Sequence, residues 1–331
     1  MAEDNIDTTM WEGFLHAGNR GALNSHPKVV PNKAALQDAG AEVAFLGFPW
    51  DAMCISRTGT NMGPKGLRDA SDQFLLYNAN TDMDLSAAFN MVDCGDIPVS
   101  PGSPVRTMDI AETLMFEIIS SGAIPVLMGG DHSITIAGAR AFAKHYEKCG
   151  MIHFDMHLDT AMDVGGETLS HCCPIPRAVE AGFDPKKIVT IGPSGWMNPK
   201  SEMQYVRDKG INLFTLEDVW EMGVETISRK AVELVSDGVD AVYLTIDIDV
   251  LDASCAPGTG VPSPVGLTAR EILAIIAGFD KAPIRAVDLA EVSPPCDQNG
   301  ITANLGVRIL LDALSTIARG QGKGGSGNQA K

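Results

Sequence analysis

The stretch GMIHFDMHLDT, residues 150–160, contains the pattern that decides the fold of this chain. It begins as a short apolar run and continues with Asp155, His157 and Asp159, spaced two residues apart. Because side chains two apart point to the same face of an extended chain, we expect these three to lie together at the end of a strand. Any one of them could serve a turn or cap a helix, but three potential ligands in register favour a metal site.

Two further stretches repeat this design: AVYLTIDIDVLD, residues 241–252, and AIPVLMGGDHS, residues 123–133. The first places Asp247 and Asp249 after an apolar run, where buried carboxylates are costly unless a cation or hydrogen-bond donors compensate them. The second places His132 after two glycines, and alone it is typical of a strand-to-helix turn with Asp131 as cap. Ligands of open α/β sheets bind outside the carboxyl ends of the strands, so we expect the three stretches to share one site.

The order of elements predicts one α/β domain with a parallel sheet. Between residues 42 and 318, apolar runs of strand length alternate with amphipathic segments of helix length, which is typical of repeated βα units. The eight expected strands are 41–47, 90–94, 123–128, 150–155, 187–191, 212–215, 241–247 and 284–291. The expected helices include 65–77, 107–120, 133–145, 225–235, 268–279 and 302–318.

The two ends of the chain differ from this central region, which we expect to be the catalytic domain, residues 41–318. Residues 1–40 lack the periodicity and carry Asn, Gly and Pro, so they are predicted to form an arm over the domain or toward a neighbour. Residues 319–331 are rich in Gly and polar residues and are predicted to be disordered.

Composition excludes several classes of partner and compartment. The formal net charge of −17 would repel phosphate backbones and anionic membrane surfaces, so we expect no nucleic acid and no membrane partner. The seven cysteines lack the spacing of a disulfide framework or a zinc ribbon, which favours a reducing compartment. The opening MAEDNIDTTM has acids where a targeting signal would need basic residues, so we expect a cytoplasmic protein.

The candidate ligands singled out in the three stretches are two imidazoles and four carboxylates. Oxygen-rich sets with some nitrogen suit a pair of Mn²⁺ or Ni²⁺ ions better than the thiolate-rich sets of structural zinc. We therefore expect two divalent metal ions as cofactors, either nickel or manganese.

The segments GGDHS, FDMHLDT, DIDVLDASCAPGTG and EVSPPCD resemble, in order and spacing, the signatures of the ureohydrolase superfamily, which includes arginase, agmatinase, guanidinobutyrase and formimidoylglutamase. The resemblance spans roughly residues 42 to 318. It implies an arginase-like three-layer α/β/α fold around an eight-stranded parallel sheet, and a homo-oligomer, either a trimer or a hexamer. It also implies one metal held by His132, Asp155, Asp159 and Asp247 and a second held by Asp155, His157, Asp247 and Asp249.

The resemblance assigns further roles in the hydrolysis of a small cationic guanidino substrate. Glu291 matches the glutamate that grips the guanidinium, although an ion pair with a local arginine such as Arg285 is the alternative. His171, in TLSHCCP, matches a mobile histidine that exchanges protons with substrate or solvent. Asp159 and His171 are then expected to pass a proton to the departing amine.

Several loops depart from the usual pattern without removing a metal ligand. His171 is followed by Cys172 and Cys173, and Trp196 follows a segment in which a family arginine is common. We expect Cys172 and Trp196 to contact the substrate, Cys172 and Cys173 to be packing thiols rather than a soft metal site, and the substrate to be a compact guanidine or a biguanide such as metformin. The alternatives are an agmatinase or guanidinobutyrase, and a non-catalytic partner subunit of a hetero-oligomer.

Overall fold

The computed structural model describes residues 21–27 and 29–323 and contains one parallel sheet whose strands run in the order β1, β5, β2, β6, β11, β10, β7, β8, β9. The eight expected strands are all present, and the two-residue strand β1 (His26–Pro27) pairs with β5 at one edge. The eight are β2 (Val43–Gly47), β5 (Met91–Asp96), β6 (Ile124–Met128), β7 (Cys149–Phe154), β8 (Ile188–Ile191), β9 (Asn212–Phe214), β10 (Ala241–Asp247) and β11 (Ile284–Ala290).

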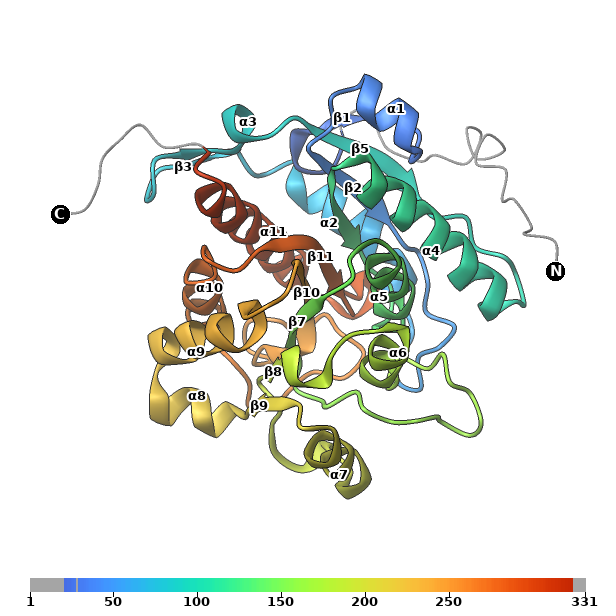
Figure 1. Ribbon diagram of the computed structural model, residues 1–331, viewed down its shortest axis with the longest axis vertical. Coiled ribbons are helices and arrows are strands. Elements are labelled where there is room, and N and C mark those ends of the chain that lie inside the picture. The colour runs from blue at the N-terminus through green and yellow to red at the C-terminus, as the bar shows by residue number, and fades with distance from the viewer. Residues whose placement is uncertain (1–20, 28, 324–331) are drawn as a thin grey trace.

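Helices cover both faces of this sheet, so the predicted three-layer α/β/α fold is confirmed (Figure 1). One face carries α1 (Lys33–Asp38), α4 (Pro104–Ser121), α5 (Ile134–His145) and α6 (Pro174–Ala181), whose apolar residues pack together in one core cluster. The other face carries α2 (Gly63–Ser71), α9 (Val224–Ser236), α10 (Ala269–Ala277) and α11 (Ile301–Gly320), with a second cluster. The strands are buried on both sides, which explains why they are continuous apolar runs in the sequence.

Helix α11 is long and apolar enough to cross a membrane by length and composition, but most of it is buried inside the protein, as in a core helix of a globular domain. It packs against α2 and α10 and follows the central strand β11.

Short helices account for most differences from the sequence-based expectation. The expected helix 65–77 ends at Ser71, and Tyr77–Asn78 instead forms strand β3, which pairs with β4 (Met83–Asp84) in a hairpin. The helices that were not predicted are α1, α3 (Leu85–Ala88), α6, α7 (Lys200–Lys209) and α8 (Leu216–Met222). Helices of four to ten residues are too short for a clear apolar period, so caps such as the Thr215–Asp218 capping box mark them better than periodicity does.

Both ends of the described chain pack on the domain. The Ala22 amide donates a hydrogen bond to the buried Asp93 carboxylate at 2.7 Å, and Arg68 pairs with the same carboxylate at 2.9 Å. At the other end, Lys323 pairs with Glu42 at 2.5 Å, so ordered chain extends beyond the expected start of the tail. The remaining tail, 324–331, and residues 1–20 of the expected arm lie outside the described residues.

Candidate metal centre

The predicted metal ligands and Glu291 come from the carboxyl ends of four strands that are neighbours in the sheet. His132 follows β6, Asp155 follows β7, Asp247 ends β10 and Glu291 follows β11. Because β6, β11, β10 and β7 lie in that order at the centre of the sheet, segments that are far apart in sequence meet at one edge. The expectation that the three ligand stretches share one site therefore agrees with the topology.

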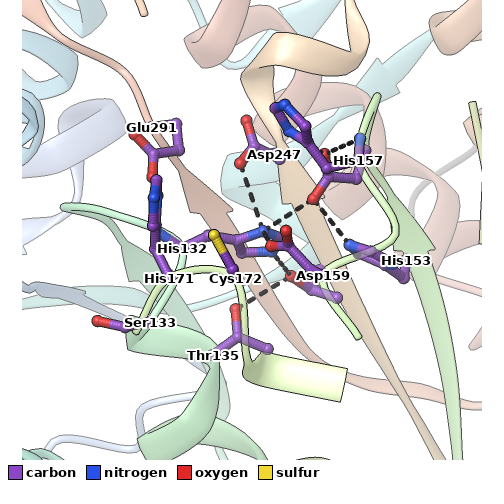
Figure 2. Close-up of polar contacts among 12 residues, drawn as sticks. His132, Ser133, Thr135, His153, His157, Asp159, His171, Cys172, Asp247 and Glu291 are labelled. Carbon is purple, nitrogen blue, oxygen red and sulfur yellow. Dashed lines mark hydrogen bonds and ion pairs between the residues drawn. The ribbon is translucent and has the colours of Figure 1, made fainter. Parts of the chain in front are cut away.

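His132 lies at the centre of the first group of ligands (Figure 2). Its Nδ1 atom is 2.8 Å from Asp159 Oδ2, 3.0 Å from Asp155 Oδ2 and 3.3 Å from Asp247 Oδ2. All four side chains are buried. These are the four residues that the sequence analysis assigned to one metal ion.

His157 organises the second group. Its Nδ1 atom is 3.2 Å from Asp155 Oδ1 and 3.3 Å from Asp249 Oδ2. Asp155 thus presents one carboxylate oxygen to each histidine, which is the arrangement that a carboxylate bridging two ions requires. Asp247 lies beside Asp249, whose amide donates a hydrogen bond of 2.8 Å to Asp247 Oδ1.

The backbone around these side chains is closely constrained. Asp159 and Glu291 adopt positive φ angles of 50° and 62°, a conformation that non-glycine residues rarely adopt and that is often found at functional sites. A Cβ atom on Gly130 would lie 1.9 Å from the Trp50 carbonyl oxygen, so only glycine allows the turn before His132 to pack there.

The donor set fits two divalent cations. Burial, together with the charges of Asp249 and Asp155, raises the pKa of Asp247 well above its ordinary value, and burial raises the pKa of Asp249 to about 6. Buried carboxylates that repel one another in this way need cationic partners. Two imidazoles and four carboxylate side chains supply the nitrogen and oxygen ligands that such ions prefer. Five of these six side chains belong to two groups able to hold an ion, and the sixth, Asp247, lies 3.3 Å from His132 Nδ1.

His153 was not predicted as a ligand, but it lies in the first group of potential ligands. Its Nε2 atom is 3.0 Å from Asp155 Oδ2 and its Nδ1 atom is 3.2 Å from Thr190 Oγ1. The signal was present, because the spacing of two that links Asp155, His157 and Asp159 extends back to His153. Thr245 was missed as well: its hydroxyl lies 2.9 Å from His132 Nε2 and helps to fix the orientation of that ring.

His171 and Glu291 lie together beside the metal ligands (Figure 2). His171 Nδ1 is 2.9 Å from Glu291 Oε1, and the amide of His132 donates a hydrogen bond to the same oxygen at 2.9 Å. Burial lowers the pKa of His171, but its hydrogen bonds with Cys172 and Glu291 outweigh this and raise the pKa above its ordinary value. The alternative partner Arg285 is exposed and lies at the opposite end of β11, so it does not pair with Glu291.

A cavity of about 800 Å³ opens over these residues. Cys172 lines it, as expected, whereas Cys173 is buried. Trp196 is not among the residues that line the cavity: its side chain is 101% exposed, and Met197 of the same short helix, Gly195–Met197, lines the cavity instead. Among the described residues, the lining contains no lysine or arginine, but includes the carboxylates of Asp163, Glu202 and Asp208.

Comparison with known proteins agrees with this arrangement. Residues 41–315 match the profile of the Arginase family. A guanidinobutyrase from Pseudomonas aeruginosa is 33% identical over 277 residues, which cover 83% of this chain and 86% of the relative. An agmatinase from Bacillus subtilis is 34% identical over 276 residues, covering 83% and 91% respectively. The solved structure of the proclavaminate amidino hydrolase from Streptomyces clavuligerus has a TM-score of 0.83 and 31% identity to this chain, covering 90% and 96%.

The family match extends from just before β2 into α11 and includes every predicted metal ligand. Arginase-family enzymes use a binuclear divalent metal site, and the two groups of histidine and aspartate side chains described above are consistent with one. The chain therefore belongs to the arginase family and is a ureohydrolase that cleaves a carbon–nitrogen bond in a guanidino compound.

Proposed function

We propose that the substrate is a compact, cationic guanidine or biguanide without a carboxylate group, such as guanidine, an alkylguanidine or metformin. The products would be urea or guanylurea together with ammonia or an amine. The observation that carries this proposal is the lining of the cavity, which is acidic and apolar and contains no lysine or arginine among the described residues.

The charge of the lining disfavours substrates with an anionic end. The carboxylate of guanidinobutyrate or arginine would lose its hydration on entering the cavity, and no cationic side chain of the described lining would compensate that loss. A guanidinium or biguanide cation has no such end. The guanidinobutyrase alternative is therefore the weaker one on electrostatic grounds.

Apolar side chains complement a small alkylated cation. Ile55, Met162, Met197 and Val261 line the cavity, and covering a methyl group with such side chains gains roughly 0.8 kcal/mol per buried carbon. These four residues take the role that the sequence analysis gave to Trp196.

Agmatine is the second candidate, and a specific observation favours it. Asp163, Glu202 and Asp208 line the cavity together with the catalytic side chains, and any of them could pair with the distal ammonium of a longer substrate. A biguanide could also pair with these carboxylates, but without a distal ammonium, because its positive charge is delocalised over all of its nitrogen atoms.

The proposed reaction assigns one task to each side chain. When bound by the six ligands, two divalent ions supply Lewis acidity that lowers the pKa of water and stabilises developing negative charge. The Glu291 carboxylate would hold the guanidinium by paired hydrogen bonds and so fix the position of its carbon atom. His171, whose Nδ1 atom lies beside Glu291, would donate a proton to the departing amine, with Asp159 assisting.

The test is a substrate panel with the purified chain, loaded in turn with manganese and with nickel. We expect guanidine, methylguanidine or metformin to give the highest kcat/KM, agmatine a lower one, and guanidinobutyrate and arginine the lowest. A kcat/KM for guanidinobutyrate above those of all the compact guanidines would overturn the proposal. Activity that requires a second, related subunit would instead favour the hetero-oligomer alternative.

A further inference from the structure

We propose that Cys54, His171 and Glu291 form a third metal site, separate from the binuclear centre, which takes a thiophilic divalent ion such as Zn²⁺ and thereby closes the cavity to substrate. A sulfur, a nitrogen and a carboxylate oxygen of these three residues all lie within 4.8 Å of one another. Glu291 and His171 are buried, and Cys54 is partly buried in the loop that follows β2.

The loop that carries Cys54 is fixed against the other two ligands. The amide of Met53 donates a hydrogen bond to Asp131 Oδ2 at 3.0 Å, and the Met53 carbonyl accepts one from the amide of His171 at 3.2 Å. The amide of Ile55 donates to His171 Nε2, also at 3.2 Å. Backbone contacts on both sides of Cys54 thus hold its thiol beside His171 without any ion.

The chemistry of the three donors differs from that of the binuclear centre. Thiolate, imidazole and carboxylate are the ligands that zinc takes in proteins, and three of them leave a fourth position open. In a tetrahedral zinc site, neighbouring donor atoms are roughly 3.5 Å apart, so these side chains need only small movements to bind. None of the six ligands assigned to the binuclear centre is a cysteine. Zinc is therefore expected to distinguish this site from its neighbours.

The atoms available for binding follow from the hydrogen bonds. Since His171 Nε2 accepts a hydrogen bond from Ile55, Nδ1 carries the proton that faces Glu291 Oε1. Zinc would bind Nδ1 of the neutral ring, so the ring proton moves to Nε2 and the hydrogen bond from the Ile55 amide is lost. The thiol proton of Cys54 is released to solvent. The Cys54 thiol contacts the Ser56 hydroxyl at 3.1 Å, a weak interaction that zinc could displace.

Zinc at this site would inhibit the reaction, because it would occupy Glu291, proposed to hold the substrate, and His171, proposed to protonate the departing amine. This inhibition rests on the proposed function. We expect zinc to inhibit the manganese-loaded or nickel-loaded enzyme competitively with the guanidino substrate. Replacing Cys54→Ser should preserve activity without zinc and raise the half-inhibiting zinc concentration about tenfold or more, since a lost ligand costs at least as much as a lost outer-shell contact. Cys255→Ser, at another partly buried thiol, is the matched control.

Binding is measured independently of activity. The metal-loaded wild-type chain should take up one further zinc ion by equilibrium dialysis and elemental analysis, while Cys54→Ser should not. With Co²⁺ in place of zinc, the wild type and Cys255→Ser should show a near-ultraviolet charge-transfer band from a thiolate ligand, and Cys54→Ser should lack it. If Cys54→Ser does not fold, Cys54→Ala serves instead.

The possible results distinguish the existence of the zinc site from its effect on the reaction. Absence of the thiolate band in wild type, or a band that survives in Cys54→Ser but disappears in Cys172→Ser, would overturn the site. Cys54-dependent zinc binding with competitive inhibition would support the whole inference. Cys54-dependent binding with non-competitive inhibition would support the site and contradict the substrate role proposed for Glu291.

Discussion

Glu291 combines a rare backbone conformation with two polar neighbours. Its φ angle is positive, and its Oε1 atom lies 2.9 Å from both the His132 amide and His171 Nδ1. Glu291→Gln keeps the shape and removes the charge, so we expect both metal ions to remain and kcat/KM to fall roughly 10-fold to 100-fold, the usual worth of a charged hydrogen bond. Steady-state kinetics and elemental analysis measure the two effects. Glu217→Gln, at an exposed carboxylate on α8, should change neither, and an unchanged kcat/KM in Glu291→Gln would refute the assignment.

Asp155 and His171 should respond to substitution in opposite ways. The Asp155 carboxylate faces His132 with one oxygen and His157 with the other, so Asp155→Asn should release metal and abolish activity. His171 contacts Glu291 rather than the metal ligands, and His171→Ala should retain both ions and lose mainly kcat. Metal content and kcat of the two variants provide the comparison. Metal loss in His171→Ala, or full turnover across the pH range, would contradict the proton-transfer role.

Strands β10 and β11 are joined by buried side chains as well as by backbone hydrogen bonds. The Tyr243 hydroxyl donates to Asp288 Oδ2 at 2.8 Å, and Thr135 from α5 donates to the same oxygen at 2.8 Å. Tyr243→Phe leaves a fully buried carboxyl with one donor fewer, so the free energy of unfolding should fall by about 1–3 kcal/mol. Urea denaturation measures this. Tyr77→Phe, which removes a hydroxyl from the exposed hairpin, should cost less than about 0.5 kcal/mol, and an equal effect would argue against burial as the cause.

The long strands were predictable from the sequence because burial on both faces makes them continuous apolar runs. The metal ligands were predictable because they are spaced two residues apart at the ends of such runs. The short helices were not, since four to ten residues give too little periodicity. Trp196 shows a second limit: the sequence places it near the site, but the direction of a side chain in a short helix depends on tertiary packing. The proximity of the Cys54 thiol to His171 was likewise not predictable, because only the tertiary fold brings the two loops together.

Buried carboxylates repel one another in the metal-free protein, and we expect bound metal ions to remove this repulsion. In the metal-free protein, burial raises the pKa of Asp249 to about 6 and that of Glu202 to about 7, and the carboxylates around His132 and His157 raise the pKa of those rings despite their burial. All four groups bind protons more tightly when folded. The contribution of Asp249 and Glu202 to stability is therefore present below pH about 4 and is lost as pH rises through about 6 to 7. The contribution of His132 and His157 is fully present below pH about 6.5 and declines gradually above it, because the pKa values of both rings are raised well above that.

We therefore expect the melting temperature of the metal-free chain to fall between pH 5 and pH 8. Manganese should raise that temperature more at pH 8 than at pH 5, because the ions bind only the folded state and compete with fewer protons at high pH. Thermal melts with and without metal at both pH values test this. A metal-induced increase that is larger at pH 5 would show that the cluster does not bind the ions.

Strand β11 is the last strand in the sequence, yet it lies between β6 and β10 in the middle of the sheet. Until it inserts, the earlier strands cannot form one continuous sheet, and the hydrogen bond from His132 to Glu291 joins residues 159 positions apart. Contacts of such long range form late and slowly during folding. On the ribosome, synthesis must pass Ala290 before the centre of the sheet can close. Metal ions would therefore slow unfolding of the finished protein without accelerating its refolding, because the complete site is absent from every earlier intermediate.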